Sequence, residues 1–247
     1  MRFEGKVALV TGGGRGIGAA TCELFAREGA SVAVCDMDLE PAQEVAGPLG
    51  DRALAVACDV TKRDQVGAAV GKAVEAFGRL DILVACAGIT RDNMLYKMTD
   101  DDWMGVINTH LTGTFLAAQA AQAVMVPQRY GRMVFLSSTS ALGNRGQANY
   151  STAKAGLQAL ARTLSIELGQ FGITVNAVAP GFVETRMTEA TARRMGVDWE
   201  DFKKAAAERT PVRRVGQPGD IAHAIAFFCS EESGFVSGQT LYVRGGP

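Results

Sequence analysis

Seven short apolar runs, most of them rich in β-branched residues, alternate along this chain with segments of helical character. The runs lie at residues 6–11, 31–36, 53–58, 80–86, 132–136, 173–178 and 240–243. Near-continuous apolar strands separated by helices are typical of a parallel sheet that is covered on both faces and joined by right-handed crossovers. The sequence therefore predicts a doubly wound α/β fold with seven strands in the order 3-2-1-4-5-6-7.

Length and charge narrow the class of protein further. The chain has 247 residues, is 47% hydrophobic and 21% charged, and shows no change of composition, so a single domain over residues 1–247 is expected. The 25 basic and 26 acidic residues give a net charge of -1 without a basic cluster, which argues against nucleic acid as a partner. No apolar run reaches the roughly 20 residues that span a bilayer, and the amino terminus lacks a signal-peptide stretch. We therefore expect a soluble, cytoplasmic protein with no membrane partner.

Cysteine and histidine usage gives no sign of a disulfide framework or a metal site. The five cysteines form no C-x-x-C pair, and we expect reduced core residues at Cys22, Cys35, Cys58, Cys86 and Cys229. The chain has only two histidines and no clustered ligand spacing. No metal is predicted.

A glycine-rich turn joins the first predicted strand to a helical segment at about residues 16–28. It begins at Thr11 and continues through Gly12, Gly14, Arg15, Gly16, Ile17 and Gly18. Glycines at such a junction let the backbone approach a pyrophosphate and leave the first N–H groups of the helix free to bind it. The T-G-x-x-x-G-x-G spacing, placed directly after the first strand, predicts a Rossmann-type dinucleotide-binding turn.

Asp36 ends the second predicted strand, where a dinucleotide-binding fold presents a side chain to the adenosine ribose. A carboxylate there accepts hydrogen bonds from both ribose hydroxyls and repels a 2′-phosphate, which favours NAD(H) over NADP(H). Arg15 could instead bind that phosphate, which leaves NADP(H) as the alternative. Asp36 could also simply open the turn before the next helix. Asp59 and Val60 follow the third strand at the same predicted edge and could bracket the adenine.

Tyr150 and Lys154 lie four residues apart in a helical segment predicted over residues 147–169, so their side chains leave one face of the helix. A neighbouring ammonium favours the phenolate and is expected to lower the tyrosine pKa from its usual value of about 10. Such a pair suits general acid–base catalysis. Tyrosine and lysine also occur at this spacing on helices that have no catalytic role.

With these features, the chain resembles the short-chain dehydrogenase/reductase family over about residues 6–246. The matching motifs are Thr11–Gly18, Asp59-Val60, Ala87-Gly88, the Tyr150/Lys154 pair and Asn176-Ala177-Val178-Ala179-Pro180-Gly181. Within the family it is most similar to the 3-oxoacyl-[acyl-carrier-protein] and 3-oxoacyl-CoA reductases, through residues 88–92, 146–150 and 180–185.

The resemblance implies that Tyr150 donates a proton to the carbonyl oxygen, while Lys154 lowers the tyrosine pKa and holds the nicotinamide ribose. It also implies a serine that orients the carbonyl. Counting thirteen residues back from the tyrosine gives Ser137, whereas counting along the preceding strand gives Ser138 and a loop one residue short. We choose Ser138, because strand register fixes side-chain direction whereas loops absorb deletions.

Two positions depart from the family pattern. His110 stands where the family usually has asparagine as the fourth catalytic residue. Histidine can still donate and accept hydrogen bonds, so a water relay to Lys154 is expected to survive. A histidine inside a helix can equally be structural. The stretch Ala85-Cys86 replaces two asparagines, which keeps the backbone close to the cofactor but removes their side-chain hydrogen bonds.

The resemblance also assigns residues after the sixth strand. It places Pro180, Gly181 and the Val183 backbone near the nicotinamide and Thr185 at the phosphates. Residues 184–212, apolar side chains among many charges, are predicted to form a helical lid over the substrate. The alternative is a surface pair of helices held together by those apolar residues.

The implied reaction is reduction of the ketone of a 3-oxoacyl thioester to the 3-hydroxyacyl thioester, or its reverse. The carrier of the acyl group is acyl carrier protein or CoA. Carrier-protein reductases often have a basic residue where this chain has Phe171, and its loss keeps CoA open as the carrier. Arg129 remains as a charge that could dock an acidic carrier protein. One alternative is an NAD-dependent dehydrogenase of another secondary alcohol, such as a sugar, steroid or terpenoid. Another is a nucleotide-sensing protein without turnover.

A homotetramer is expected from the same resemblance. The predicted helices at about residues 100–125 and 147–169 carry alanine-rich faces, as at residues 117–121. Small side chains allow close helix packing between subunits.

Overall fold

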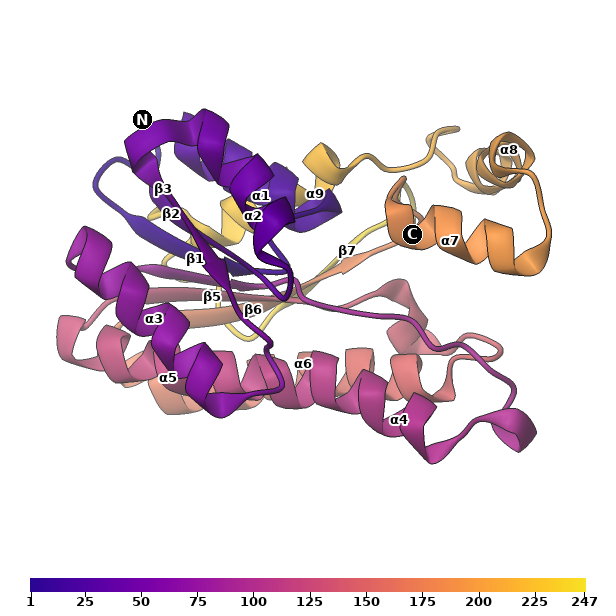
Figure 1. Cartoon of the computed structure of the whole chain (residues 1–247), viewed down its shortest axis with the longest axis horizontal. Coiled ribbons are helices and arrows are strands. Elements are labelled where there is room, and N and C mark those ends of the chain that lie inside the picture. The colour runs from indigo at the N-terminus through magenta and orange to yellow at the C-terminus, as the bar shows by residue number, and fades with distance from the viewer.

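The computed structural model describes all residues 1–247 and contains one seven-stranded sheet. The strands are β1 (Val7–Thr11), β2 (Ser31–Asp36), β3 (Ala53–Ala57), β4 (Ile82–Ala85), β5 (Gly131–Leu136), β6 (Ile173–Pro180) and β7 (Thr240–Val243). All neighbouring strands are parallel, in the order β3-β2-β1-β4-β5-β6-β7 (Figure 1). The predicted single-domain, doubly wound α/β fold is confirmed.

Helices cover both faces of this sheet (Figure 1). One face carries α1 (Gly16–Arg27), α2 (Leu39–Ala46) and α9 (Pro218–Cys229), and the other carries α3 (Arg63–Phe77), α4 (Asp100–Ile107), α5 (Gly113–Gln128) and α6 (Ala148–Leu168). Within β1, Leu9 belongs to the core beneath α3, α5 and α6, whereas Val10 belongs to the core beneath α1 and α9. Both sides of each central strand are buried, which explains why the strands are continuous apolar runs.

Residues 100–125 do not form the single helix that was predicted. α4 ends at Ile107, a π turn occupies Asn108–Thr112, and α5 begins at Gly113. A π turn inserts an extra residue and so rotates the side chains around it relative to a regular α-helix. His110 lies within this turn and is 1% exposed.

The alanines of α5 also differ from their predicted role. Ala117, Ala118 and Ala121 are buried in the core of this chain, so they are not available to a second subunit. The outer face of this helical layer is formed instead by residues such as Phe115 of α5 and Ala155, Ala159 and Ile166 of α6.

Two helices, α7 (Arg186–Met195) and α8 (Trp199–Arg209), stand beyond the carboxyl ends of the strands (Figure 1). Aromatic packing holds α8 to the end of β6. The ring centroid of Phe182 lies 6.2 Å from that of Trp199 and 5.4 Å from that of Phe202. The predicted helical segment at 184–212 therefore exists as two helices.

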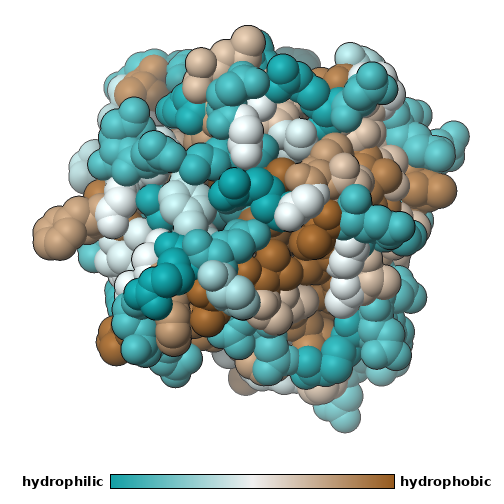
Figure 2. Space-filling view, turned by 90° about the vertical axis from the view of Figure 1, so that its left-hand side faces the viewer, coloured by the Kyte–Doolittle hydropathy of each residue, from teal (hydrophilic) through white to brown (hydrophobic).

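The opposite side of the molecule, at the amino ends of the strands, faces the viewer in Figure 2. Hydrophilic side chains cover much of this face, and the most hydrophobic ones gather in a patch near its middle. None of the helices is both long enough and apolar enough to cross a membrane.

Candidate active site

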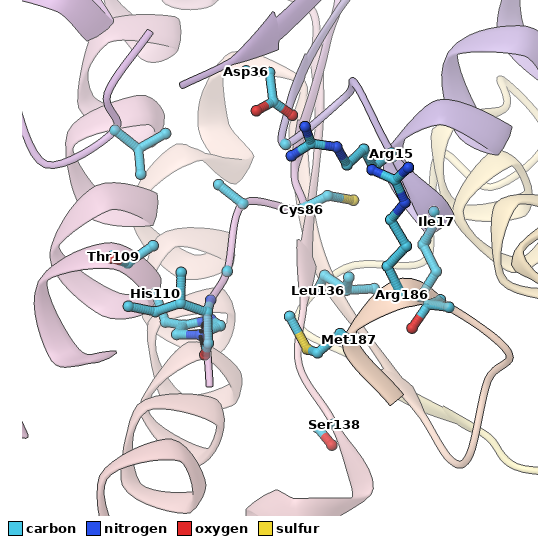
Figure 3. A pocket seen from close by; sticks show the side chains of 18 of the residues that line it. Arg15, Ile17, Asp36, Cys86, Thr109, His110, Leu136, Ser138, Arg186 and Met187 are labelled. Atoms are coloured by element: carbon cyan, nitrogen blue, oxygen red, sulfur yellow. Dashed lines mark hydrogen bonds between the residues drawn. The ribbon is translucent and has the colours of Figure 1, made fainter. Parts of the chain in front are cut away.

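The main pocket lies at the carboxyl ends of the strands, where a doubly wound sheet binds its ligands (Figure 3). Its walls come from the turn between β1 and α1, the ends of five further strands, the π turn, the start of α6 and the first turn of α7. Every predicted site residue except Gly14 lines this pocket, namely Gly12, Arg15, Gly16, Ile17, Gly18, Asp36, Asp59, Val60, Ala87, Gly88, His110, Ser138, Tyr150, Lys154, Pro180, Gly181, Val183 and Thr185.

Close packing explains the glycines of the turn after β1. A Cβ on Gly12 would lie 2.7 Å from the Cα of Ala87, and a Cβ on Gly18 would lie 2.0 Å from the carbonyl oxygen of Gly12. The helix α1 has no side-chain cap at its amino end and no acidic residue in its first turn. Its first N–H groups are therefore available to an anion, as the sequence predicted.

Asp36 opens the turn after β2 and also lines the pocket, so the role at the ribose remains a prediction. Its Oδ2 accepts a hydrogen bond from the Gly14 N–H at 3.1 Å, and its Oδ1 accepts one from the Asp38 N–H at 3.4 Å. The carboxylate thus opens the turn after β2, and it also lines the pocket. Arg15 extends towards Asp36 in Figure 3, and its guanidinium lies 3.7 Å from the carboxylate of Asp38.

Tyr150 and Lys154 lie in the first two turns of α6. The Lys154 Nζ is 5.3 Å from the centroid of the Tyr150 ring and donates a hydrogen bond to the backbone oxygen of Leu136. Burial lowers the pKa of Lys154 to about 7. Burial also raises the pKa of Tyr150 to about 12, although a hydrogen bond with Ser138 pulls this pKa downwards.

The expected lowering of the Tyr150 pKa by Lys154 is therefore wrong for this arrangement. Removal from water penalises the charged forms of both side chains and is the largest cause of both pKa shifts. Tyr150 remains protonated at neutral pH, which suits a proton donor.

The two adjacent serines after β5 have different partners. Ser137 is 2% exposed, and its Oγ donates to the backbone oxygen of Lys154 at 2.8 Å and accepts from the Gln158 Nε2 at 3.0 Å. The Ser138 Oγ accepts from the Ser140 N–H at 3.1 Å, and Ser138 exerts a downward pull on the pKa of Tyr150. Ser137 is thus used to anchor α6, and the geometry favours Ser138 as the serine that meets a substrate.

His110 packs edge-on against the Tyr150 ring, with 5.1 Å between ring centroids. Its Nε2 lies 2.8 Å from the backbone oxygen of Ile89 and 3.1 Å from the Ile89 nitrogen, while its buried Nδ1 has no partner. Burial, and then the nearby charge of Lys154, lower the pKa of His110 well below its ordinary value, so the imidazole is neutral at neutral pH. No direct hydrogen bond joins His110 to Lys154, and the predicted relay remains a prediction.

All five cysteines are free thiols, and four of them are buried in the core as predicted. Cys86 instead lines the pocket beside Ala87. Burial raises the pKa of Cys86 to about 12, so this thiol is protonated at neutral pH.

Several pocket residues were not named individually as site residues from the sequence. These are Met37, Asp38, Cys58, Ile89, Thr109, Leu136, Arg186, Met187 and Thr188. Ile89 lies in the matching stretch 88–92 and Arg186 in the predicted lid segment 184–212, so the sequence indicated these regions but not these side chains. The last three belong to the first turn of α7, which the fold brings against the glycine turn.

Comparison with known proteins agrees with this site. The sequence profile of the family described as Enoyl-(Acyl carrier protein) reductase matches residues 12–247, nearly the whole chain. The chain belongs to the short-chain dehydrogenase/reductase family. As a member of this family it is an oxidoreductase that uses a nicotinamide cofactor.

Three members of the family illustrate the range of its similar proteins. The short-chain reductase protein NovJ of Streptomyces niveus is 45% identical, covering 98% of this chain and 93% of NovJ. The 3-oxoacyl-[acyl-carrier-protein] reductase FabG of Escherichia coli is 40% identical, covering 100% of this chain and 98% of FabG. The (2S)-[(R)-hydroxy(phenyl)methyl]succinyl-CoA dehydrogenase subunit BbsD of Thauera aromatica is 40% identical, covering 100% of this chain and 98% of BbsD.

The pocket fits the dinucleotide that a short-chain dehydrogenase/reductase needs. The packed glycines keep side chains out of the turn, and the uncapped start of α1 offers N–H donors to a diphosphate. Asp36 can accept hydrogen bonds from an adenosine ribose at one end of the pocket. Tyr150 and Lys154 lie in the same pocket, at the place where chemistry on a bound substrate would occur.

Proposed function

We propose that the chain reduces the ketone of a 3-oxoacyl thioester to the 3-hydroxyacyl thioester, or catalyses the reverse reaction. The observation that carries this proposal is the presence of Ser138, Tyr150 and Lys154 in one pocket with the glycine turn. Full-length similarity to FabG and BbsD supports a thioester substrate, because these relatives are named for acyl-carrier-protein and CoA substrates.

Three side chains would carry out the proton chemistry. The nicotinamide cofactor, when bound, supplies the hydride that adds to the carbonyl carbon. Ser138 holds the carbonyl oxygen through its hydroxyl, and Tyr150 donates its phenolic proton to that oxygen as the C=O bond becomes C–OH. Lys154 Nζ lies 5.3 Å from the centroid of the Tyr150 ring, and its pKa of about 7 allows it to return a proton to the resulting phenolate.

Asp36 supports NAD(H) as the preferred cofactor. Its carboxylate lines the pocket at the end of β2 and would repel a 2′-phosphate. Arg15 extends to the same region, but Asp38 lies 3.7 Å from its guanidinium and offsets part of its charge. NADP(H) is the alternative cofactor.

The carrier is either CoA or acyl carrier protein. Phe171 packs against the hydrophobic core, and the guanidinium of Arg129 donates to the backbone oxygen of Gln170 at 2.8 Å. Arg129 is exposed and its charge can still face an acidic carrier protein, but no second cation accompanies it at position 171. This weaker electrostatic steering supports CoA as at least an equal candidate.

We further propose that α7 and α8 act as the lid and that the chain forms a homotetramer. The first turn of α7 lines the pocket, whereas α8 is attached through Trp199 and Phe202 and through the ion pair between Lys203 and Glu184. The outer face of α5 and α6 exposes Phe115 and Ile166 together with the small residue Ala159, which suits helix packing between subunits.

Steady-state reduction of acetoacetyl-CoA with NADH and with NADPH tests the function. Tyr150→Phe serves as the matched blank, because it removes only the proton-donating hydroxyl. We expect tyrosine-dependent turnover that prefers NADH. A preference for NADPH would show that Arg15 outweighs Asp36. Turnover only with other secondary alcohols would replace the thioester assignment, and no redox activity across a broad panel would support a nucleotide-sensing protein.

A further inference from the structure

Arg186 lies where the start of α7 meets the pocket. It is the first residue of α7, directly after the capping residue Thr185, and it lines the pocket together with Arg15. A Cβ on Gly16 would lie 3.5 Å from the Cγ2 of Thr185. The amino ends of α1 and α7 therefore lie next to each other at the pocket, and Arg15 and Arg186 flank this junction (Figure 3).

Positive charge at this junction is largely unpaired. Arg186 forms no ion pair and no side-chain hydrogen bond, whereas its neighbours in α7 do, since Arg193 pairs with Glu189 and Arg194 with Asp92. The only ion pair of Arg15 is its 3.7 Å contact with exposed Asp38. Two helix amino ends add further positive potential at the same place. Like charges so arranged repel one another unless an anion lies between them.

Backbone N–H groups at this junction are also free to bind an anion. In α7 the Thr188 N–H is bonded to the Thr185 Oγ1 at 3.3 Å, but the N–H groups of Arg186 and Met187 have no acceptor in the chain. Free N–H groups at a helix start, next to an unpaired guanidinium, form a phosphate-binding arrangement. The adjacent start of α1 offers the same kind of donors.

We propose that Arg186 is a cofactor-binding residue carried by the lid, and that its guanidinium binds the diphosphate of the dinucleotide. This inference rests on the nicotinamide cofactor of the proposed function and not on the identity of the substrate. The diphosphate, rather than a 2′-phosphate, is the expected partner because Thr185, the residue before Arg186, contacts the start of α1, whereas Arg15 is the arginine that extends to Asp36 (Figure 3).

A direct binding titration tests this assignment without any substrate. NADH and NADPH fluorescence is titrated with the wild-type chain, Arg186→Gln and the control Arg193→Gln, which removes an exposed arginine from the same helix. Loss of one charge-assisted phosphate contact should weaken both cofactors roughly tenfold in Arg186→Gln and leave Arg193→Gln within about twofold of wild type. ADP, which keeps the diphosphate, should lose affinity similarly, whereas AMP should lose less.

The outcomes separate this inference from the proposed reaction. Unchanged NADH affinity in Arg186→Gln would overturn the role of Arg186 while leaving the reductase assignment intact. A loss confined to NADPH would transfer the contact to the 2′-phosphate and also contradict it. Normal binding by the wild type without reduction of acetoacetyl-CoA would remove the thioester assignment but not the role of Arg186.

Backbone hydrogen exchange provides a second readout. If Arg186 links the lid to the cofactor, NADH should slow exchange in peptides from residues 184–212 of the wild type and of Arg193→Gln. Arg186→Gln should lose this protection at saturating NADH, because α7 then lacks its contact with the diphosphate. Equal protection in both variants would show that the lid responds to the cofactor without Arg186.

Discussion

Lys154 is 2% exposed, and its ammonium must be desolvated whenever the chain folds. A lysine whose pKa falls from its ordinary value of 10.5 to about 7 in the folded chain binds fewer protons when folded. The free energy of unfolding therefore rises with pH between about 7 and 10.5. Below about pH 7 the cost of burying Lys154 lowers it by the full amount. The burial of Lys154, a proposed catalytic residue, therefore lowers the stability of the fold.

Replacing this lysine should reveal the cost. We expect Lys154→Met to abolish reductase activity and to raise the free energy of unfolding at pH 7 by on the order of 2 kcal/mol. The gain should shrink at about pH 9.5, because the unfolded lysine then approaches neutrality. Urea denaturation at both pH values measures this, with exposed Lys72→Met as the control. A Lys154→Met variant less stable than wild type at pH 7 would contradict the argument.

The two serines after β5 allow a sharp comparison. Ser138→Ala should lower kcat by about a hundredfold or more, since it removes the hydroxyl that holds the developing charge. Ser137→Ala should keep turnover within about fivefold but lose about 1 kcal/mol of stability, because its bonds to Lys154 and Gln158 are structural. Steady-state kinetics and denaturation of both variants decide the matter. Near-normal turnover in Ser138→Ala would refute its assignment.

The π turn between α4 and α5 is the element that positions His110. It directs the ring against Tyr150 and against the backbone at Gly88, where an added Cβ would lie 2.3 Å from the His110 ring. Because the pKa of His110 is lowered well below 6.5, the ring stays neutral and should add no inflection to the pH–rate profile near that value. The Nδ1 of His110 has no hydrogen-bond partner, so it is the atom that could join the predicted water relay to Lys154.

Two substitutions distinguish a relay from packing. His110→Asn keeps a hydrogen-bonding side chain and should retain kcat within about threefold, whereas His110→Phe keeps only a ring and should lose at least about tenfold. Measuring kcat alongside the KM for NADH excludes a general disturbance of the pocket. Full activity in His110→Phe would show that His110 only packs against Tyr150.

Assembly belongs to the molecule as a whole. Ile166 of α6 is 82% exposed and Phe115 of α5 is 42% exposed, so the outer face of these two helices carries apolar side chains that a second subunit could cover. We expect light scattering at micromolar protein to give four times the chain mass of 26.0 kDa. Ile166→Glu should shift the protein to smaller species, because it places charges at the helix contact. A wild-type monomer would rule the tetramer out.

The whole-molecule architecture followed from local patterns. β7 has the predicted bounds, and the glycine turn lies where the spacing placed it, because strand and turn preferences depend mainly on neighbouring residues. At the site, the i,i+4 spacing was enough to bring Tyr150 and Lys154 to one face of α6. The register of the strand before the two serines likewise allowed a choice of Ser138 over Ser137, and this choice remains a prediction.

The sequence by itself determined the sheet, the place of the glycine turn and the pairing of Tyr150 with Lys154 on one face of α6, since each is encoded within a few residues of chain. Only the tertiary structure decided the direction of the Tyr150 pKa, the π turn at His110 and the place of Arg186 beside the start of α1. Burial and proximity between segments far apart in the chain set these properties. No local pattern reports how much water a side chain loses or which distant element it will meet.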